Sequence, residues 1–553
     1  MFLLMWFSSG SYCESYEYIH TATLSGRVTD NSPAYMLYPI ANIGVGHLYK
    51  LLFTLFPEFS WYYFSSVLLF VIALSTIYYS IGSVYSYRKA IIWCVAITII
   101  YAADFVLNWN ITRISFLLCT AAIALLFNYT QTRSLKDSAI HVIAGTILFS
   151  LGFLIRPESG LLILFISLPL VIIHLGFNWR LIRVAFIFVP ALILSLVIFI
   201  DKQTTSEFYI KLSPIEEYRI ALDYILPIDS MKTAEDTVKY LALKNGMLND
   251  NGFINHDFVN RIVNGSKVPL FSSNQMLRTI EILRSIFIEN ISQTIFYILI
   301  VLLLLLSQKK FSLKGKILFW GMLLISTSLI WGISYFMTME ARVFVPLLFH
   351  LVVMSLCLFH QHIENYFDKN TFPIKFVLIA SVAAISIYAM VNHHKTKELY
   401  LSTIAGNKEG VKKLIELSHD KILVPDANGF MLLFFNNYLP NELPKYDAFK
   451  KIFLIDIETL SLSPDYKKFL DKHCNCNSSD LAAFYDYLYS IKGEVVFAAS
   501  AERMQLFEDY LRIVRKRDYV FIPYAQIPNV NSDASPTSLF RMEKNSKKSA
   551  KAI

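Results

Sequence analysis

Residues 61–82 read WYYFSSVLLFVIALSTIYYSIG, an apolar run without a single charged residue. A helix of about 20 such residues covers the ~30 Å of hydrocarbon in a bilayer. Five more runs of this kind follow before Asp201, so this part of the chain is predicted to be a series of transmembrane helices. The five runs lie at 90–107, 111–129, 139–155, 159–176 and 184–200.

The short joints between these runs alternate between two kinds of sequence. The joints around Arg88, Arg133 and Arg180 each carry two basic residues, whereas the other joints are residues 108–110 (NWN) and 156–158 (RPE). Short loops rich in Lys and Arg stay on the cytoplasmic side of a membrane. The basic joints are therefore predicted to face the cytoplasm, and the other joints to face the exterior.

Composition supports a membrane protein. Hydrophobic residues make up 55% of the chain, which excludes an ordinary soluble domain, and aromatic residues at 15% suit the two interfacial belts of a membrane protein. The formal charge of +8 is carried largely by the predicted inner loops and the tail, so it predicts no nucleic-acid partner.

Four more apolar runs follow later in the chain. The joint 309–316 between the first two of them holds four lysines, which places it inside and agrees with the sidedness of the earlier joints. The joint 338–342 is then outside. With these runs the sequence predicts an α-helical polytopic membrane protein of about 10–11 transmembrane helices. The four runs are 292–307, 317–337, 343–361 and 374–392.

Two polar stretches are predicted to lie outside between the spans. The first, 11–57, contains a run at 35–56 that is apolar enough for a span. Because this run carries Pro39, Gly44 and Gly46, we interpret it as a helix lying in the outer interface, with a span as the alternative. Residues 1–7 are expected to be the outer end of a span that starts further upstream, or a short interfacial anchor.

The second outer stretch, 202–290, is a large insert, and such inserts usually cover a site. Its helix signals are at 213–224, 234–245 and 275–289.

The segment 393–540 has a different pattern. Short β-branched or apolar runs alternate with helical stretches, which predicts a small, extracytoplasmic α/β domain after a transmembrane domain of residues 1–392. Residues 541–553, rich in Lys and Ser, are predicted to be a disordered basic tail. The predicted strands are 421–426, 451–456, 494–499 and 519–523, and the predicted helices are 407–418, 464–473, 479–491 and 501–516.

Smaller features receive structural interpretations. Cys474 and Cys476 form a C-x-C pair, a spacing that is poor for a disulfide and incomplete for zinc. His141, His350 and His360 lie in spans or at span ends, where packing or hydrogen bonds between helices are expected.

Charged residues gather at the predicted outer ends of the spans. Charges near hydrocarbon cost free energy, so their clustering on one face predicts a shared polar site; the alternative is that they only flank the helices and reach water. Arginine binds phosphate oxygens through two parallel hydrogen bonds, and a carboxylate can take a proton from an attacking hydroxyl. These residues are Asp104, Arg113, Arg156, Glu158, Glu340 and Arg342.

The first outer stretch carries a family resemblance. Residues 14–22 (ESYEYIHTA), followed by Gly26 and by residues 32–35 (SPAY), resemble the first outer loop of GT-C glycosyltransferases. The layout of surface helices, short-looped spans, large outer loop and C-terminal soluble domain is also similar. The resemblance implies a catalytic acid in this loop, matched here by Glu14, with Cys13 where a second acid often stands.

Glu17 and Asp30 remain alternative candidates for that acid. Some GT-C members use a divalent cation, so the resemblance also allows Mg²⁺ or Mn²⁺ here.

The sequence therefore predicts a bacterial-type inner-membrane glycosyltransferase with Arg113, Arg156 and Arg342 around the donor phosphate. Its partners would be membrane lipid, a polyprenyl-phosphate-linked sugar and a surface-glycan acceptor. Two alternatives stay open: a transporter or flippase of a lipid-linked glycan, and a non-catalytic membrane scaffold. A transporter should show broken helices or an internal repeat.

Overall fold

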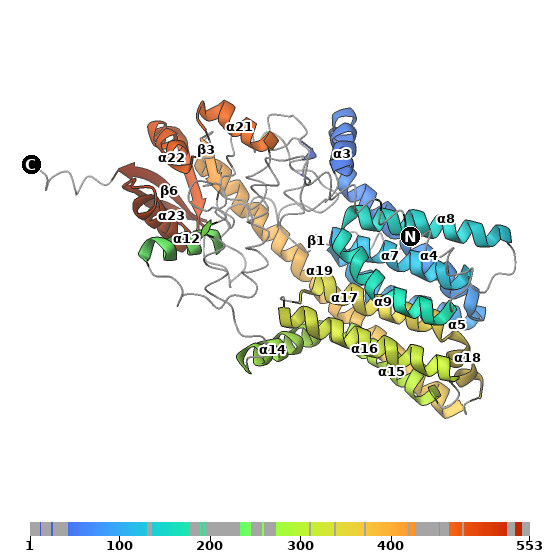
Figure 1. The fold of residues 1–553 in the computed structure, drawn as a ribbon. Helices are drawn as coiled ribbons and strands as arrows, with labels where there is room; N and C mark the ends of the chain where they lie inside the picture. Colours follow the sequence, from blue (N-terminus) through green and yellow to red (C-terminus); the bar gives the residue numbers. More distant parts are fainter. Residues whose placement is uncertain are drawn as a thin grey trace, which may run out of the picture.

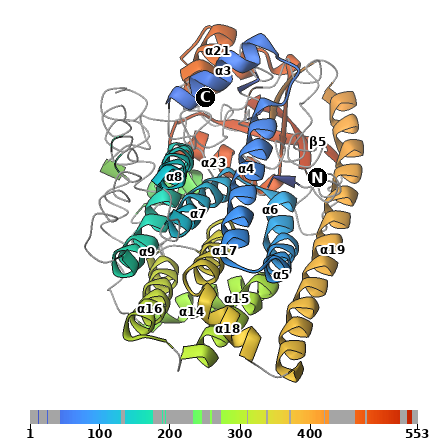
Figure 2. The same cartoon turned by 90° about the vertical axis from the view of Figure 1, so that its right-hand side faces the viewer.

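The structure is a computed structural model of the 553-residue chain. It describes residues 11–12, 21, 24–25, 43–129, 135–175, 189, 193, 233–244, 257–258, 273–308, 311–336, 339–369, 372–418, 421–425, 453, 464–477, 480–527 and 537–544. Two parts are visible: a bundle of long helices, and a smaller part with a sheet at one end of that bundle (Figures 1 and 2). We call the end of the bundle nearest to this sheet the sheet end.

Apolar helices build the bundle. The apolar run at 61–82 lies in α4 (Trp61–Val84). The next run is continuous from Tyr87 to Leu107, as α5 (Tyr87–Ile97), a π-helical turn η2 (Thr98–Ala102) and α6 (Ala103–Leu107). The other bundle helices are α7 (Ile111–Tyr129), α8 (Leu135–Ile155), α9 (Pro157–Leu175), α15 (Ile291–Ser307), α16 (Leu313–Phe336), α17 (Ala341–Leu358) and α18 (His360–Lys369).

Six helices of the described chain are long and apolar enough to cross a membrane, or seven if the bent pair α14–α15 is one span. This number is smaller than the predicted 10–11. The apolar parts of α7 and α8, at Ile111–Phe127 and Ala139–Ile155, are shorter than a usual span. The predicted span at 184–200 lies almost entirely outside the described residues.

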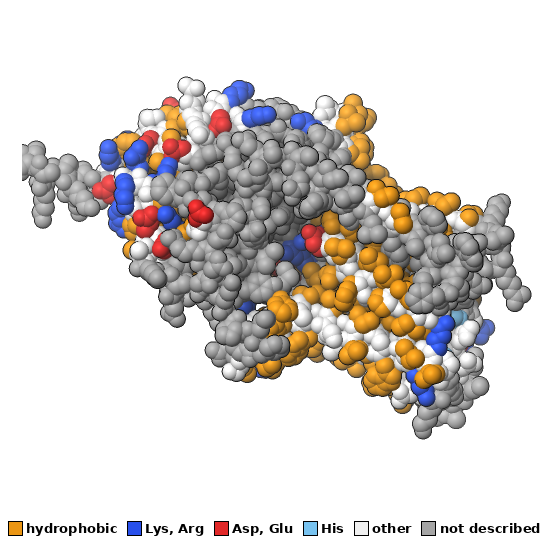
Figure 3. Space-filling model, viewed as in Figure 1, with side chains coloured by type: hydrophobic (Ala, Val, Ile, Leu, Met, Phe, Trp, Pro, Cys, Tyr) orange, Lys and Arg blue, Asp and Glu red, His pale blue; other side chains and the backbone are white. Residues whose placement is uncertain are grey.

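The core of the bundle forms around α7 and α17. Every residue from Ile111 to Phe127 is buried, and α7 packs against α4, α8, α9 and α17. The outer helices keep large apolar side chains on their exposed faces, such as Phe165 on α9 and Leu324 on α16. Figure 3 shows these side chains as a broad hydrophobic surface over the bundle. Such a surface is compatible with a surrounding lipid phase.

Two buried histidines, His141 and His350, form hydrogen bonds between helices, as predicted. His350 of α17 is hydrogen-bonded to Thr120 of α7 (3.1 Å) and to Ser167 of α9 (3.0 Å). His141 of α8 is hydrogen-bonded to the hydroxyl of Tyr79 on α4 at 3.1 Å. The interpretation of these histidines as links between helices is confirmed.

Two helices of the predicted outer stretches lie near the sheet end. One is α3 (Ile43–Leu55), inside the predicted surface helix 35–56. The other is α14 (Ser273–Glu289), which is bent by 96° from α15. The predicted helix at 213–224 lies outside the described residues. Between residues 11 and 42 the structure describes Ser11–Tyr12, which form a short strand, β1, and the positions 21, 24 and 25, of which Thr21 and Leu24 are helical.

The C-terminal part contains a mixed four-stranded sheet in the order β3-β4-β6-β5. The strands are β3 (Ile422–Pro425), β4 (Val495–Ala499), β5 (Tyr519–Ile527) and β6 (Thr537–Lys544). β3 and β4 are parallel, whereas β6 pairs antiparallel with both β4 and β5. Its helices are α21 (Pro464–Cys474), α22 (Leu481–Ser490) and α23 (Ala501–Ile513).

Three expectations about this part need correction. The tail predicted at 541–553 begins too early, because β6 continues to Lys544. The predicted boundary between 392 and 393 falls inside one helix, α19 (Phe372–Ser418), whose 47 residues run from the bundle to the sheet. Cys474 and Cys476 are joined by a disulfide, which their spacing argued against. Asn475 between them adopts a positive φ of 46°, and this left-handed conformation turns the two cysteines toward each other.

The predicted strand at 451–456 is described only at Phe453, whose N–H donates to the carbonyl of Leu423 in β3 at 2.9 Å. The insert 202–290 also reaches the sheet region, because its helix α12 (Ala234–Lys244) packs against α23.

Candidate functional site

Two turns at the sheet end of the bundle carry most of the predicted site residues. Arg156 directly precedes α9, and Pro157 occupies the first position of that helix, where its fixed φ is preorganised and its missing N–H costs nothing. Glu340 is the residue that precedes α17, and Arg342 lies in the first turn of that helix. Each turn therefore presents one arginine and one glutamate.

Hydrogen bonds from α7 fix the position of the turn at Arg156. Ser115 donates its hydroxyl hydrogen bond to the carbonyl of Gly152 at 2.7 Å and lies 3.2 Å from the carbonyl of Arg156. There is no room for a side chain at Gly152, because a Cβ there would lie 2.7 Å from the sulfur of Cys119. This close approach of α8 to α7 fixes where α9 begins.

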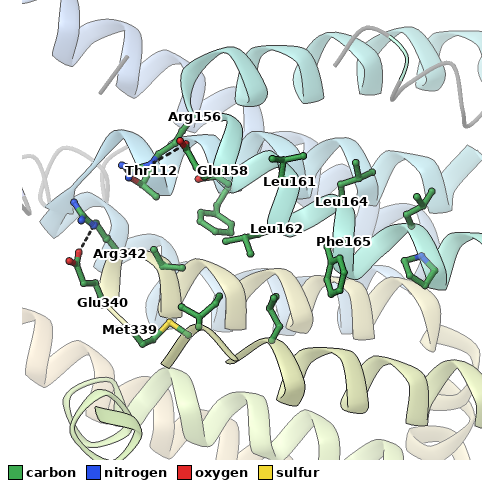
Figure 4. Close-up of a pocket in the computed structure, with 17 residues that line it drawn as sticks. Thr112, Arg156, Glu158, Leu161, Leu162, Leu164, Phe165, Met339, Glu340 and Arg342 are labelled. Atoms are coloured by element: carbon green, nitrogen blue, oxygen red, sulfur yellow. Dashed lines mark hydrogen bonds and ion pairs between the residues drawn. The ribbon is translucent and has the colours of Figure 1, made fainter. Parts of the chain in front are cut away.

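Both turns face one cavity of about 810 Å³ between α7, α9, α16 and α17. Figure 4 shows the polar residues together at the start of α9 and α17, while leucines and Phe165 follow along the helices. The cavity is thus apolar along most of its length and polar at one end. The residues lining it are Thr112, Phe116, Arg156, Glu158, Ser159, Leu161, Leu162, Leu164, Phe165, Leu168, Pro169, Leu329, Ile333, Met339, Glu340, Arg342 and Val343.

The charged groups at the polar end form pairs within their own turns. Nη1 of Arg156 donates to the hydroxyl of Thr112 at 2.5 Å, and its Nε lies 3.8 Å from Oε2 of Glu158. Arg342 forms an ion pair with Glu340. The carboxylates are more accessible than the guanidinium groups, since the side chain of Glu158 is 69% exposed and that of Arg156 is 20% exposed. Both arginines also line the cavity.

Arg113 and Asp104 have a different environment. The side chain of Arg113 is 3% exposed, and its Nη1 lies 2.5 Å from Oδ2 of Asp104. Asp104 also accepts a hydrogen bond from the amide of Asn108 at 3.0 Å, and Asn108 accepts one from the hydroxyl of Tyr400 on α19 at 2.6 Å. Among the described residues that line the cavity, neither Asp104 nor Arg113 is present. The structure therefore brings Arg156 and Arg342 together but sets Arg113 apart.

The three predicted acids of the first outer loop, Glu14, Glu17 and Asp30, lie outside the described residues. The backbone just before Glu14 is described. β1 (Ser11–Tyr12) pairs in parallel with β2 (Asn108–Trp109), so that Ser11 lies opposite Asn108. Ser11 and Tyr12 thus lie at the sheet end of the bundle, next to Asn108, whose amide donates to Asp104.

Sequence reasoning missed two hydroxyl residues of the cavity. Thr112 accepts the hydrogen bond from Arg156, and Ser159 lies in the first turn of α9. A signal for Ser159 was present, because a small hydroxyl residue follows Arg-Pro-Glu at the start of a helix. Among the described residues, no group of three or more His, Cys, Asp or Glu is arranged to hold a metal ion.

Comparisons with protein-family models, with curated proteins and with solved structures return no match to this chain. The resemblance to GT-C glycosyltransferases therefore stays a prediction that rests on residues 14–35 and on the layout of the chain.

Proposed function

We propose that this protein is a membrane glycosyltransferase that transfers a sugar from a polyprenyl-phosphate donor to a surface-glycan acceptor on the outer face of the membrane. The observation that carries the proposal is the cavity: a long apolar wall ends at two arginines. A lipid-linked phosphate has this same division into an apolar chain and an anionic head.

The dimensions suit a lipid chain. The apolar lining on α9 runs from Leu161 to Pro169, which at 1.5 Å per residue is about 12 Å of helix. Leu161 and Phe165 are more than half exposed on the bundle surface, so the wall is open to the surrounding phase. A prenyl chain could enter sideways from the membrane and leave its phosphate at Arg156 and Arg342.

The proposed chemistry needs a base near the reacting sugar. Glu14 would accept the proton of the acceptor hydroxyl as it attacks the anomeric carbon, and the lipid phosphate would leave between the two arginines. Glu17 and Asp30 are the alternative bases, and a divalent cation would have to use such loop acids. Three parts of the chain support a site at the sheet end: β1 next to Asn108, the turn at Arg156 and the turn at Arg342.

Sidedness has its own support. Arg88, Lys89, Lys314 and Lys316 belong to the predicted inner joints. Figure 3 shows Lys and Arg side chains at the end of the bundle away from the sheet. The contact between α12 and α23 agrees with placing the insert and the C-terminal domain on one common side. The Cys474–Cys476 disulfide favours an oxidising compartment for that side. Together they favour an extracytoplasmic C-terminal domain.

The test is transfer of labelled sugar from a polyprenyl-phosphate donor by the purified protein in nanodiscs. Wild-type protein should form product, and Glu14→Gln should lose most of the activity while it unfolds at the same temperature. Glu281→Gln, on the exposed face of α14, is a matched control that should stay active. Full activity of Glu14→Gln would remove that residue from the mechanism, and movement of the intact lipid-linked glycan without any product would replace transfer by transport.

A reporter fused after Ile553 tests sidedness separately. An alkaline phosphatase fusion should be active and a green fluorescent protein fusion dark. The opposite result would place the polar end of the cavity in the cytosol and would contradict the proposed reaction on the outer face.

A further inference from the structure

One buried hydroxyl in the cavity has no hydrogen-bond partner in the part of the chain that the structure describes. Ser159 is 1% exposed, and its Oγ makes no hydrogen bond within the described part of the chain. A buried hydroxyl without a partner loses its bonds to water and gains nothing in return. Because Ser159 lines the cavity, a bound molecule is the natural partner for this group.

Ser159 lies where a helix also offers backbone donors. It is the third residue of α9, a helix of 19 residues. The first amides of a helix have no carbonyl of the same helix to bind, and together they carry a partial positive charge. The first amide that turns back to its own helix is that of Gly160, which bonds to the carbonyl of Arg156 at 3.4 Å. The amides of Glu158 and Ser159 come before it, beside the Ser159 hydroxyl.

The two arginines do not by themselves make this end of the cavity positive. Arg156 pairs with Glu158, and Arg342 pairs with Glu340, so the four formal charges cancel. An anion that enters needs further donors that carry no carboxylate of their own. The Ser159 hydroxyl and the N-terminus of α9 are donors of this type, and Ser159 lines the same cavity as the two arginines.

We infer that Ser159 and the first turn of α9 form a binding site for the phosphate group of a lipid phosphate, with Ser159 donating a hydrogen bond to a phosphate oxygen. The inference rests on the proposed function for the cavity. It adds a residue that binds the phosphate of the lipid rather than its prenyl chain. The apolar wall favours a phosphate attached to a lipid over a free phosphate ion.

The test compares three probes on the detergent-purified protein by isothermal titration: geranylgeranyl phosphate, geranylgeraniol and inorganic phosphate. Ser159→Ala should weaken geranylgeranyl phosphate about tenfold or more, the usual effect of losing a hydrogen bond to a charged group. It should leave geranylgeraniol unchanged. Ser159→Cys, with a weak S–H donor, should fall between wild type and Ser159→Ala, and it serves if the alanine variant does not fold.

Ser334→Ala is the matched control. Ser334 is also 1% exposed, and its Oγ has no hydrogen-bond partner among the described residues, but it does not line the cavity. It should bind all three probes like wild type. Equal binding of geranylgeranyl phosphate by wild type and both Ser159 variants would overturn the inference, and so would inorganic phosphate binding as tightly as the lipid phosphate.

Failure of the phosphate site and failure of the proposed transferase activity give different results. A protein that binds geranylgeranyl phosphate through Ser159 but transfers no sugar keeps the phosphate site and loses the transferase. A protein that transfers sugar equally well with and without Ser159, with unchanged binding, keeps the transferase and loses the phosphate site.

Discussion

Arg113 and Arg156 lie at the same end of the bundle, and both have a carboxylate nearby, yet their surroundings are opposite. Arg113 is enclosed and lies 2.5 Å from Asp104. Arg156 borders a cavity, and the Glu158 carboxylate at 3.8 Å is mostly in the open. An enclosed pair stabilises the position of its helices, because neither charge can leave without a large cost. A pair at a cavity can exchange its partner for a ligand. The difference teaches that burial, rather than residue type, separates a structural arginine from a binding one.

The largest effect should come from breaking the enclosed pair. Asp104→Ala removes the carboxylate that lies 2.5 Å from the buried guanidinium of Arg113, which should destabilise the protein by about 3–5 kcal/mol. Thermal unfolding in detergent measures this change. The double variant Asp104→Leu with Arg113→Met should recover most of the stability, since replacing both charges by apolar groups is often neutral. A stable single variant would show that Asp104 is not a structural partner of Arg113.

The cavity arginines should show the reverse pattern. Arg156→Ala and Arg342→Ala should each lower kcat/KM for sugar transfer about 10–100-fold, the effect of losing a hydrogen bond to a charged group of about 1.5–3 kcal/mol. Their unfolding temperatures should stay near that of wild type. Lys89→Ala, which removes a pair with Glu364 at the far end of the bundle, is the control. Loss of stability without a specific loss of transfer would place these arginines with Arg113.

Removing the charge of Glu158 should have a smaller effect of opposite sign, namely tighter binding of the lipid phosphate. Glu158→Gln removes the negative charge next to Arg156, so geranylgeranyl phosphate should bind about two- to fivefold more tightly, in line with the ~0–1 kcal/mol of an exposed ion pair. Titration calorimetry checks this. Weaker binding would mean that Glu158 positions Arg156 instead of competing with the ligand.

The smallest effect is expected at a third, more exposed pair in the sheet region. Burial disfavours the charged form of Asp486, but hydrogen bonds from Arg517 and Tyr519 and the charges of Arg517 and Lys544 outweigh it, so the pKa of Asp486 lies below its usual value. A lowered pKa contributes stability above the unfolded pKa of about 3.9 and loses it as the pH falls through the folded pKa.

This contribution should therefore be present at pH 7 and disappear below about pH 4. Because the side chain of Asp486 is 38% exposed, it should stay below about 1 kcal/mol. Hydrogen exchange of β5 in the full chain, corrected for intrinsic rates, measures it in wild type and in Asp486→Asn. Asp509→Asn, in another exposed pair, is the control. A pH response that Asp486→Asn leaves unchanged would assign it to other groups.

The sequence predicted helices far better than partners. The run at 61–82 became α4 with nearly the same limits, because a mostly apolar run of this length without a charge allows few other structures. The first and last limits of β6 could not be predicted, since its residues 537–544 carry charges and become a strand only by pairing with β4 and β5. Likewise, the disulfide depends on the positive φ of Asn475, which the C-x-C spacing alone does not reveal.

The candidate site divides in the same way. Arg156 and Arg342 could be predicted to lie at one level because each opens a span, and they do line one cavity. That Arg113 belongs to Asp104 follows from three-dimensional packing of α6 and α7, which no spacing encodes. Ser159 was overlooked because a serine in an apolar helix has no meaning until its unpartnered hydroxyl is seen beside a cavity.

The 47 residues of α19 make a single rod of about 70 Å, more than twice the thickness of the hydrocarbon layer. Each residue added within such a rod turns everything beyond it by about 100°. The number of residues in α19 between the bundle and Ser418 therefore fixes the rotation of the sheet about the helix axis. Loss or gain of one residue there would swing the sheet away from its present face, whereas a change of seven residues would nearly restore it and only raise its height by about 10 Å.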